Sequence, residues 1–408
     1  MFSFGELDAI YRRIIEAKSL LNGVIHKTPL DRSKTFSQMT SSEVYLKLEN
    51  LQKTGSFKIR GAYYKIKKLP SDLKEKGIIA ASAGNHAQGV AFAASKAGVK
   101  STIIMPEWAP IAKILATKSY GANVVLYGTT FDEAYNKALE LAKEQGFTFI
   151  HPFDDLDIIA GQGTIGLEIL EDLPNPDIIV VPIGGGGLIS GISIALRKKL
   201  RDHIRIVGVQ TKAFPSMIKN QYSIDKTQKF TIADGIAVKK PGKYTKEIIS
   251  KLVDDIITVD DNEIARAIFL LLERAKTVAE GAGAISLAAI LSGQIDVKNK
   301  KVVAVISGGN IDLTLLTKII NRELVRFRRL VKLKITLPDR PGSLKDVLTT
   351  FTSARINIID IQSERYEPRI LPSEAEVTIT AEIPEPDLLN EIVKKLRKSN
   401  IFVEEIKT

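Results

Sequence analysis

The chain of 408 residues contains no cysteine. Without thiols it can form neither a disulfide nor a thiolate metal site, so nothing in it requires an oxidising compartment. It also has no apolar run long enough to cross a bilayer. Its first residues, with Ser3 and Glu6, form a helix-capping pattern in place of a secretory signal. These absences predict a cytoplasmic protein with no membrane partner.

The chain also lacks a groove motif of alternating basic and aromatic residues. Its formal net charge is +11, but Lys and Arg are interspersed with acids almost everywhere. We therefore expect no nucleic-acid partner. The chief exception is a basic cluster that we interpret as a linker between domains, from residue 322 to 334: Arg326, Arg328, Arg329, Lys332 and Lys334.

The length is too great for one compact core and predicts two or three domains. Up to about residue 326, short apolar strands alternate with helices, which predicts an α/β fold with parallel sheets covered by helices. From Val331 the pattern changes to strand, helix, two strands, helix and strand, a ferredoxin-like βαββαβ order. We therefore place a first domain at residues 1–325 and a second domain at residues 331–408.

Lys58 stands in the string Ser56–Gly61, shortly after the strand-like run Glu43–Leu48. The pattern places it in the first turn of a helix, where the positive end of the helix dipole and partial burial lower the pKa of the amine. Such an amine is a nucleophile at neutral pH, as condensation with an aldehyde requires. The alternative is an ordinary surface lysine.

Three further strings each follow a predicted strand. Ser82–Gly89 and the glycine loop Gly184–Gly187 both open helices, and Ser307 begins the turn Ser307–Asn310. Helix N-termini bind anions, and glycines let the backbone approach a phosphate closely. Ligands gather at the carboxyl ends of strands in open α/β sheets, so we expect one site.

Each string also has an ordinary structural interpretation. The glycine loop does not fit a Walker loop and lacks the third glycine of a dinucleotide fingerprint, and it could be a hinge. His86 could be a satisfied helix-start residue, Asn85 an N-cap and Ser307 the start of a turn.

Taken together, the strings SFKIRGA, SAGNHAQGVA, VPIGGGGLISG, TIADGIAV and ISGGN resemble the motif set of the fold-type-II pyridoxal phosphate (PLP) enzymes. The resemblance is to the branch that holds the threonine/serine dehydratases and serine racemases, and it covers about residues 25–322. It implies a two-lobed fold, with a smaller mobile lobe at about residues 51–153 and PLP in the cleft.

The resemblance also implies roles for individual residues. Lys58 would form the imine with the cofactor, next to Phe57, and Asn85 would bond the ring hydroxyl. Ser307 would meet the pyridine nitrogen. The remaining implied contacts are the phosphate loop, Gly184, Gly185, Gly186, Gly187 and Leu188, and the substrate-carboxylate loop, Ser82, Ala83, Gly84 and His86.

Residue 83 separates two reactions within this branch. The racemases place a serine hydroxyl there, on the cofactor face opposite the lysine, whereas this chain has Ala83. A methyl group cannot move a proton, which favours β-elimination of L-threonine to 2-oxobutanoate and ammonia, with L-serine as a secondary substrate. Some relatives bind a divalent metal through carboxylates in the segment that matches residues 208–216. This chain has none there, so we expect no metal. Glu280 and Asp234 remain possible carboxylates of the site wall, although a helix-start charge or a turn residue explains them nearly as well.

The C-terminal string Leu337–Leu344, followed by Asn357 and Ile358, resembles the small-molecule-binding ACT domain. In that family, paired domains bind an amino acid at their interface, near residues that match Gly342 and Asn357. The resemblance implies an amino-acid effector, isoleucine before others, and a homodimer or homotetramer. The alternatives are a serine racemase, an inactive amino-acid sensor and, less in keeping with the motifs, a nucleotide-dependent oxidoreductase.

Overall fold

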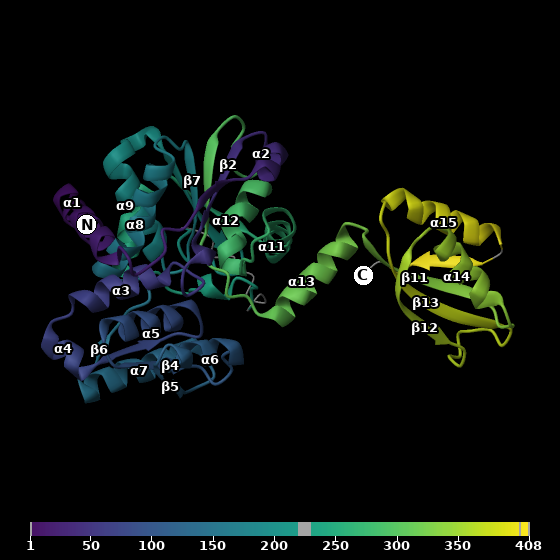
Figure 1. Ribbon diagram of the computed structural model, residues 1–408, viewed down its shortest axis with the longest axis horizontal. Coiled ribbons are helices and arrows are strands. Elements are labelled where there is room, and N and C mark those ends of the chain that lie inside the picture. Colours follow the sequence, from purple (N-terminus) through teal and green to yellow (C-terminus); the bar gives the residue numbers. More distant parts are fainter. Residues whose placement is uncertain (1, 219–229, 400, 407–408) are drawn as a thin grey trace. The chain divides into compact units, whose positions relative to one another are not determined.

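The computed structural model describes residues 2–218, 230–399 and 401–406, and the chain divides into two compact units, residues 1–313 and 314–408. Figure 1 traces both. No helix in the described part of the chain is both long and apolar enough to span a membrane.

The larger sheet of the first unit has six strands in the order β1-β2-β10-β7-β8-β9, all parallel except the edge strand β1. Its central strands β7 and β10 are almost wholly buried. Parallel strands covered on both faces read as continuous apolar runs, which is why these strands were visible in the sequence. The bounds are β1 Leu30–Arg32, β2 Glu43–Leu48, β7 Ile178–Pro182, β8 Arg205–Thr211, β9 Asp255–Val259 and β10 Lys301–Ile306.

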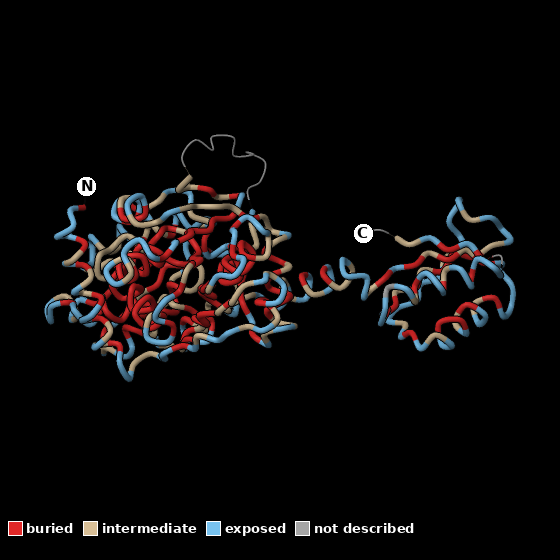
Figure 2. The backbone as a smooth tube through the Cα atoms, turned by 90° about the horizontal axis from the view of Figure 1, so that it is seen from above, coloured by how far each residue is buried: buried red, intermediate tan, exposed pale blue. Residues whose placement is uncertain are grey.

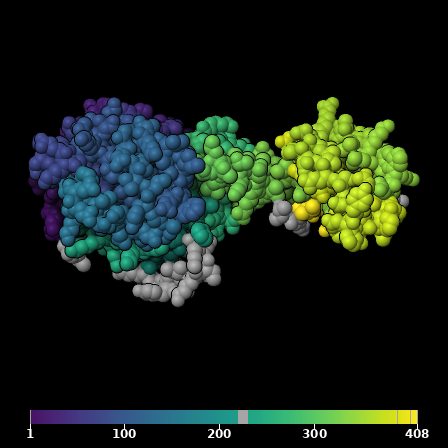
Figure 3. All heavy atoms as spheres, turned by 90° about the horizontal axis from the view of Figure 1, so that it is seen from below, coloured from purple at the N-terminus to yellow at the C-terminus, as the bar shows by residue number. Residues whose placement is uncertain are grey.

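The smaller sheet has four parallel strands in the order β5-β4-β3-β6 and is built from one continuous stretch of chain. This stretch lies inside the range expected for the smaller lobe. In Figure 3 its blue side chains form a continuous part of the surface of the first unit. The bounds are β3 Ile78–Ala81, β4 Ser101–Met105, β5 Asn123–Leu126 and β6 Thr148–Phe149.

Helices cover both sheets, and the buried residues in Figure 2 concentrate inside these layers. Helix α1 begins with the capping box predicted for Ser3 and Glu6. The bounds are α1 Phe4–Leu21, α2 Lys34–Thr40, α3 Lys58–Lys68, α4 Ser71–Lys76, α5 Asn85–Ala97, α6 Ile111–Ser119, α7 Phe131–Gln145, α8 Leu156–Asp172, α9 Gly187–Leu200, α10 Lys243–Leu252, α11 Asp261–Ala275 and α12 Gly281–Leu291, with short 3-10 turns η1 Glu49–Leu51, η2 Arg201–His203 and η3 Asp234–Ile236.

The second unit has an antiparallel four-stranded sheet in the order β12-β13-β11-β14. It follows the predicted βαββαβ sequence of elements, and its own apolar core packs the helices on the sheet. The bounds are α13 Leu313–Arg326, β11 Leu330–Pro338, α14 Ser343–Ser353, β12 Asn357–Glu364, β13 Glu374–Glu382, α15 Pro386–Lys398 and β14 Phe402–Glu405.

The predicted basic linker at residues 322–334 is wrong for most of its length. Its first residues end helix α13 and its last residues belong to strand β11, so only residues 327–329 lie between regular elements. The error has a physical cause. Basic side chains on the exposed faces of a helix and a strand look like a solvated linker in one dimension. The apolar residues that face inward, such as Val331 and Leu333, are the part that packs.

Candidate active site

A cavity of about 920 Å³ opens between the two sheets of the first unit. Most of the residues singled out in the sequence line it: Phe57, Lys58, Ser82, Ala83, Gly84, Asn85, His86, Gly184, Gly185, Gly186, Gly187, Leu188 and Ser307. The three strings follow strands of two different sheets, β3 in the smaller and β7 and β10 in the larger. The one site expected from the three strings is therefore formed by the strand ends of two sheets.

Backbone contacts fix Lys58 beside Ser307. Ser56 and Gly308 form an isolated antiparallel bridge, and the N–H of Phe57 donates to the carbonyl oxygen of Ser307 at 3.2 Å. Helix α3 then begins at Lys58, as predicted. The start of this helix is thus joined to the end of β10, which follows it in the sequence by more than two hundred residues.

Two glycine contacts hold helix α3 close to its neighbours. A Cβ on Gly161 of α8 would lie 2.5 Å from the Cα of Gly61, and one on Gly89 of α5 would lie 3.1 Å from the carbonyl carbon of Lys58. The first approach requires glycine, and the second is tighter than most Cβ contacts. A side chain at either glycine would move its helix away from α3. The position of Lys58 therefore depends on both helix contacts.

Lys58 is half-buried as a residue, and its side-chain amine donates to the carbonyl oxygen of Pro152 at 2.8 Å. Burial lowers the pKa of Lys58 to about 8, against a smaller opposing effect of the Glu280 carboxylate. A lowered pKa is what the sequence predicted for this amine. Its main cause is burial in the cavity wall.

The glycine loop connects β7 to α9, and Phe153 packs closely against it. A Cβ on Gly185 would lie 2.2 Å from the ring of Phe153, and one on Gly187 would lie 2.9 Å from the carbonyl oxygen of the same residue. Within the described part of the chain, the N–H groups of residues 184–188 donate to no protein acceptor. A loop with free N–H groups at a helix N-terminus fits a phosphate.

Asn85 begins α5 and is held on both sides of its amide. Asn310 donates to its carbonyl oxygen at 2.7 Å, and its own N–H group donates to a carboxylate oxygen of Glu280. Glu280 is 3% exposed, and burial followed by the nearby Asp234 charge raises its pKa to about 7. Glu280 therefore belongs to the site wall, one of the two interpretations that the sequence left open.

The hydroxyl of Ser307 donates to the carbonyl oxygen of Ala282 at 3.1 Å. To donate to a ring nitrogen, the hydroxyl would have to give up this hydrogen bond to Ala282. His86 is also occupied, since its Nε2 lies 2.9 Å from the carbonyl oxygen of Ile150 and burial lowers its pKa to about 3. The neutral ring of His86 thus positions the start of α5. Ser82 shapes the same loop, because its hydroxyl accepts the N–H of Gly84 at 3.1 Å.

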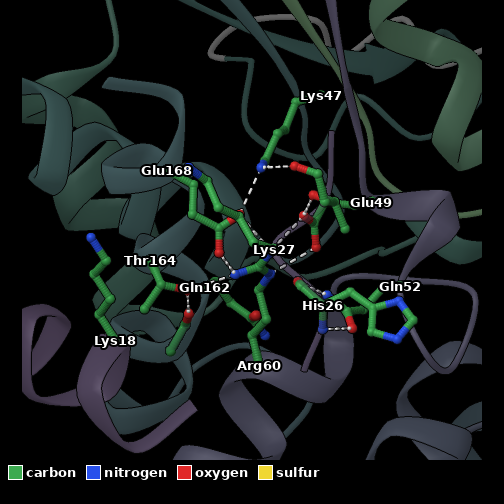
Figure 4. Close-up of polar contacts among 12 residues, drawn as sticks. Lys18, His26, Lys27, Lys47, Glu49, Gln52, Arg60, Gln162, Thr164 and Glu168 are labelled. Atoms are coloured by element: carbon green, nitrogen blue, oxygen red, sulfur yellow. Dashed lines mark hydrogen bonds and ion pairs between the residues drawn. The ribbon is translucent and has the colours of Figure 1, made fainter. Parts of the chain in front are cut away.

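Sequence reasoning assigned no role to Arg60, which is fully buried and lies two residues after Lys58. Figure 4 shows its polar contacts. Its guanidinium donates to both oxygens of Glu49, at 2.7 and 2.8 Å, and to both oxygens of Glu168, at 2.5 and 2.9 Å. Lys47 adds a bond of 2.6 Å to Glu168. Buried charges are tolerated when each is paired, and this cluster balances two positive and two negative groups. It joins α3 to β2, η1 and α8.

Sequence reasoning also missed Phe153, which packs against the glycine loop, and Asp154, which caps the start of α10. Asp154 accepts the backbone N–H groups of Lys243, Tyr244 and Thr245 at 2.8 to 3.1 Å. The only signal in the sequence was a carboxylate in a turn. Its partner lies about ninety residues further along the chain, so no local pattern could connect the two.

Residues 21–308 match the family of pyridoxal-phosphate dependent enzymes, and residues 331–399 match the ACT domain. The chain is 48% identical to the L-threonine ammonia-lyase of Thermotoga maritima over 386 residues, which cover 94% of this chain and 96% of that protein.

Two solved structures are similar to most of this chain. The processed form of threonine deaminase isoform 2 from Solanum lycopersicum has a TM-score of 0.71 at 34% identity, covering 78% of this chain and 94% of that one. Maize serine racemase also has a TM-score of 0.71 at 34% identity, covering 78% of this chain and 98% of that one.

The first unit is thus that of a pyridoxal-phosphate dependent enzyme. Its cofactor is pyridoxal 5′-phosphate. The chain belongs to the serine/threonine dehydratase family of these enzymes and carries a C-terminal ACT domain. Since a racemase and a deaminase structure match it equally well, the fold alone does not separate the two reactions.

Proposed function

We propose that the enzyme deaminates L-threonine to 2-oxobutanoate and ammonia, and L-serine to pyruvate as a secondary activity. The observation that carries this proposal is the composition of one cavity wall. Lys58 lines the cavity together with the glycine loop and Ser307, and the loop that would face the substrate presents the methyl group of Ala83.

The residues present fit the cofactor at three places. Residues 184–188 would hold its phosphate through N–H groups that donate to no acceptor among the described residues. Asn85 would contact the ring hydroxyl with the N–H that it does not give to Glu280, beside Phe57. Ser307 would meet the ring nitrogen once its hydroxyl turns from Ala282. When bound, the cofactor supplies an electron-withdrawing ring that stabilises negative charge at the substrate Cα.

Lys58 would perform the proton transfers. As a neutral amine its Nζ takes the proton from the substrate Cα, and as an ammonium it gives a proton to the β-hydroxyl, which leaves as water. A pKa of about 8 suits both directions near neutral pH. The released enamine takes up water again and loses ammonia, so threonine yields one 2-oxobutanoate and one ammonia.

The loop Ser82–His86 would receive the substrate carboxylate on its backbone N–H groups at the start of α5. Racemisation needs a second proton donor on the face opposite Lys58, and Ala83 offers none there. This residue supports elimination over the racemase alternative.

Turnover of L-threonine by the purified holoenzyme tests the function directly. We expect stoichiometric 2-oxobutanoate and ammonia, with lower kcat/KM for L-serine and little D-isomer by chiral chromatography. Accumulation of D-serine at a rate near that of pyruvate would support the racemase instead. An absorption band that borohydride does not shift would support an inactive sensor.

The second unit would regulate the first. We infer that a pair of ACT domains binds isoleucine near Gly342 and Asn357, because 2-oxobutanoate is a precursor of isoleucine and a sensor on this enzyme suits end-product feedback. Gly342 adopts a φ of +97° just before α14, and apart from its chain neighbours no described residue has an atom within 4 Å of a Cβ placed there. An open helix start with room beside it is compatible with a ligand. We also propose that the protein is a cytoplasmic homodimer or homotetramer. Its catalytic domain would span residues 1–325, with a mobile lobe at about 51–153, and its regulatory domain would span residues 331–408.

A further inference from the structure

Lys113 on helix α6 lies in the wall of the active-site cavity, although no sequence motif singled it out. Its side chain is only 12% exposed. Its Nζ lies 3.4 Å from the point that a Cβ on Gly84 would occupy, so the ammonium sits directly beside the loop Ser82–His86. A largely covered ammonium inside a cavity loses much of its hydration and needs a negative partner.

The partners of this ammonium come from the other lobe. Asp234 of η3, which follows β8 of the larger sheet, accepts from Lys113 at 3.0 Å. Burial works against the charge, but the carboxylates of Asp234 and then Glu280 outweigh it and raise the pKa of Lys113. Lys113 is therefore charged at neutral pH, and Asp234 holds it across the cavity.

The loop beside Lys113 is the one to which the substrate carboxylate is assigned. The backbone N–H groups of this loop supply only partial charges. One of them, the N–H of Gly84, already donates to the hydroxyl of Ser82. The ammonium of Lys113 carries a full positive charge beside this loop. It would strengthen carboxylate binding well beyond what the remaining N–H groups provide.

We propose that Lys113 is a substrate-binding residue, whose ammonium pairs with the α-carboxylate of the amino-acid substrate while Asp234 holds it in place from the opposite lobe. The inference rests on the proposed function only in taking an α-amino acid as the substrate. It adds an ionic contact to the backbone loop.

A second lysine in the wall of the same cavity provides a matched control. Lys239 lies 3.7 Å from Asp132, also across the two lobes, but its side chain is 73% exposed and therefore well hydrated. Lys113→Met and Lys239→Met remove the same charge from the same cavity with the same side chain. Met keeps the apolar stem of each lysine, so both variants should fold.

Lys113→Met should raise the KM for L-threonine at least about tenfold, the worth of one charge-assisted hydrogen bond. It should leave kcat nearly unchanged, and Lys113→Arg should restore much of the affinity. Lys239→Met should behave like the wild type. If Lys113→Met shows a wild-type KM while the wild type is active on L-threonine, the inference is wrong. A wild type inactive on L-threonine would instead refute the proposed function.

Inhibition of the full-length holoenzyme separates carboxylate binding from a purely structural latch. L-Alanine has the carboxylate but no leaving group, and L-alaninamide lacks the carboxylate. Lys113→Met should weaken inhibition by L-alanine about tenfold and leave inhibition by L-alaninamide unchanged. Equal weakening of both inhibitors, matched by Asp234→Asn, would mean that the ion pair only holds the lobes together, and would overturn the proposal. If neither inhibitor were weakened, the proposal would also be overturned.

Discussion

The backbone N–H of Phe57 donates a hydrogen bond of 3.2 Å to the carbonyl oxygen of Ser307. This bond joins the start of the helix that carries Lys58 to the end of strand β10 in the larger sheet. The amine and the serine hydroxyl assigned to opposite ends of the cofactor ring are therefore held together by hydrogen-bonded backbone of two segments that are distant in the sequence. A shift of either element would change both contacts.

Replacing Lys58 should abolish turnover without abolishing cofactor binding. In Lys58→Ala the glycine loop is intact and should still hold the phosphate. Equilibrium dialysis with PLP and a turnover assay measure the two effects. After borohydride reduction of the wild type, peptide mapping should find the pyridoxyl group on Lys58. A label on another lysine would refute the assignment.

The pKa of Lys58 predicts how fast the apoenzyme takes up PLP. Burial lowers this pKa from 10.5 to about 8, and only the neutral amine attacks an aldehyde. We expect the rate of uptake to rise with pH through about 8 and then level off, measured by stopped-flow absorbance. A rate that still rises steeply between pH 9 and 10, about where an exposed lysine titrates, would contradict the burial of Lys58.

Gly185→Ala should weaken PLP binding. The new Cβ would lie 2.2 Å from the ring of Phe153, and overpacking of this kind costs about 1–3 kcal/mol. PLP affinity should fall about tenfold to a hundredfold, measured by fluorescence titration. Gly5→Ala is the control, since its Cβ would meet nothing closer than Ser3 Oγ at 3.9 Å and should leave PLP binding unchanged.

Breaking the buried cluster around Arg60 should destabilise the first unit. Arg60→Met leaves Glu49 and Glu168 buried with too little positive charge, which costs about 3–5 kcal/mol. Chemical denaturation measures the loss. The control Arg205→Met removes a largely exposed pair with Asp255 and should cost about 1 kcal/mol or less. Equal losses in the two variants would contradict the argument.

The same cluster should give the protein a pH-dependent stability. Burial favours the neutral acid, but Arg60 and then Lys47 outweigh it and lower the pKa of Glu168. A carboxylate whose pKa is lower in the folded than in the unfolded state stabilises the fold fully above its unfolded pKa. This contribution is therefore lost as the pH falls below about 4.5 toward the folded pKa. Glu168→Gln should be less stable than the wild type at pH 7 and should show a weaker loss of stability with acid.

Isoleucine should bind the full-length protein and reduce threonine turnover, as calorimetry and an activity assay can measure. A coupling free energy of about 1–3 kcal/mol would suffice for this control. A chain that ends after Arg326 should stay active and lose the response. If the full-length protein neither binds isoleucine nor responds to it, the second unit is better explained as an assembly surface.

Local patterns were sufficient for the elements that carry the proposed site. The continuous apolar runs of β7 and β10 marked buried parallel strands, and Lys58 was placed in the first turn of its helix. The strand and helix order of the second unit was also predicted, because burial that alternates along most of β11 and β13 leaves a period of two in the sequence. These features depend on neighbours within a few residues.

The sequence by itself therefore determined the strand and helix types, the βαββαβ order, and the residue types of the amine, the glycine loop and Ala83. Only the tertiary structure decided that the motifs face one another from two sheets, that Glu280 and Lys113 line the cavity, and that Arg60 is held by Glu49 and Glu168. The reason is physical. Burial and charge pairing depend on residues that are distant along the chain, such as Arg60 and Glu168, and desolvation strengthens their interactions only after the helices have packed.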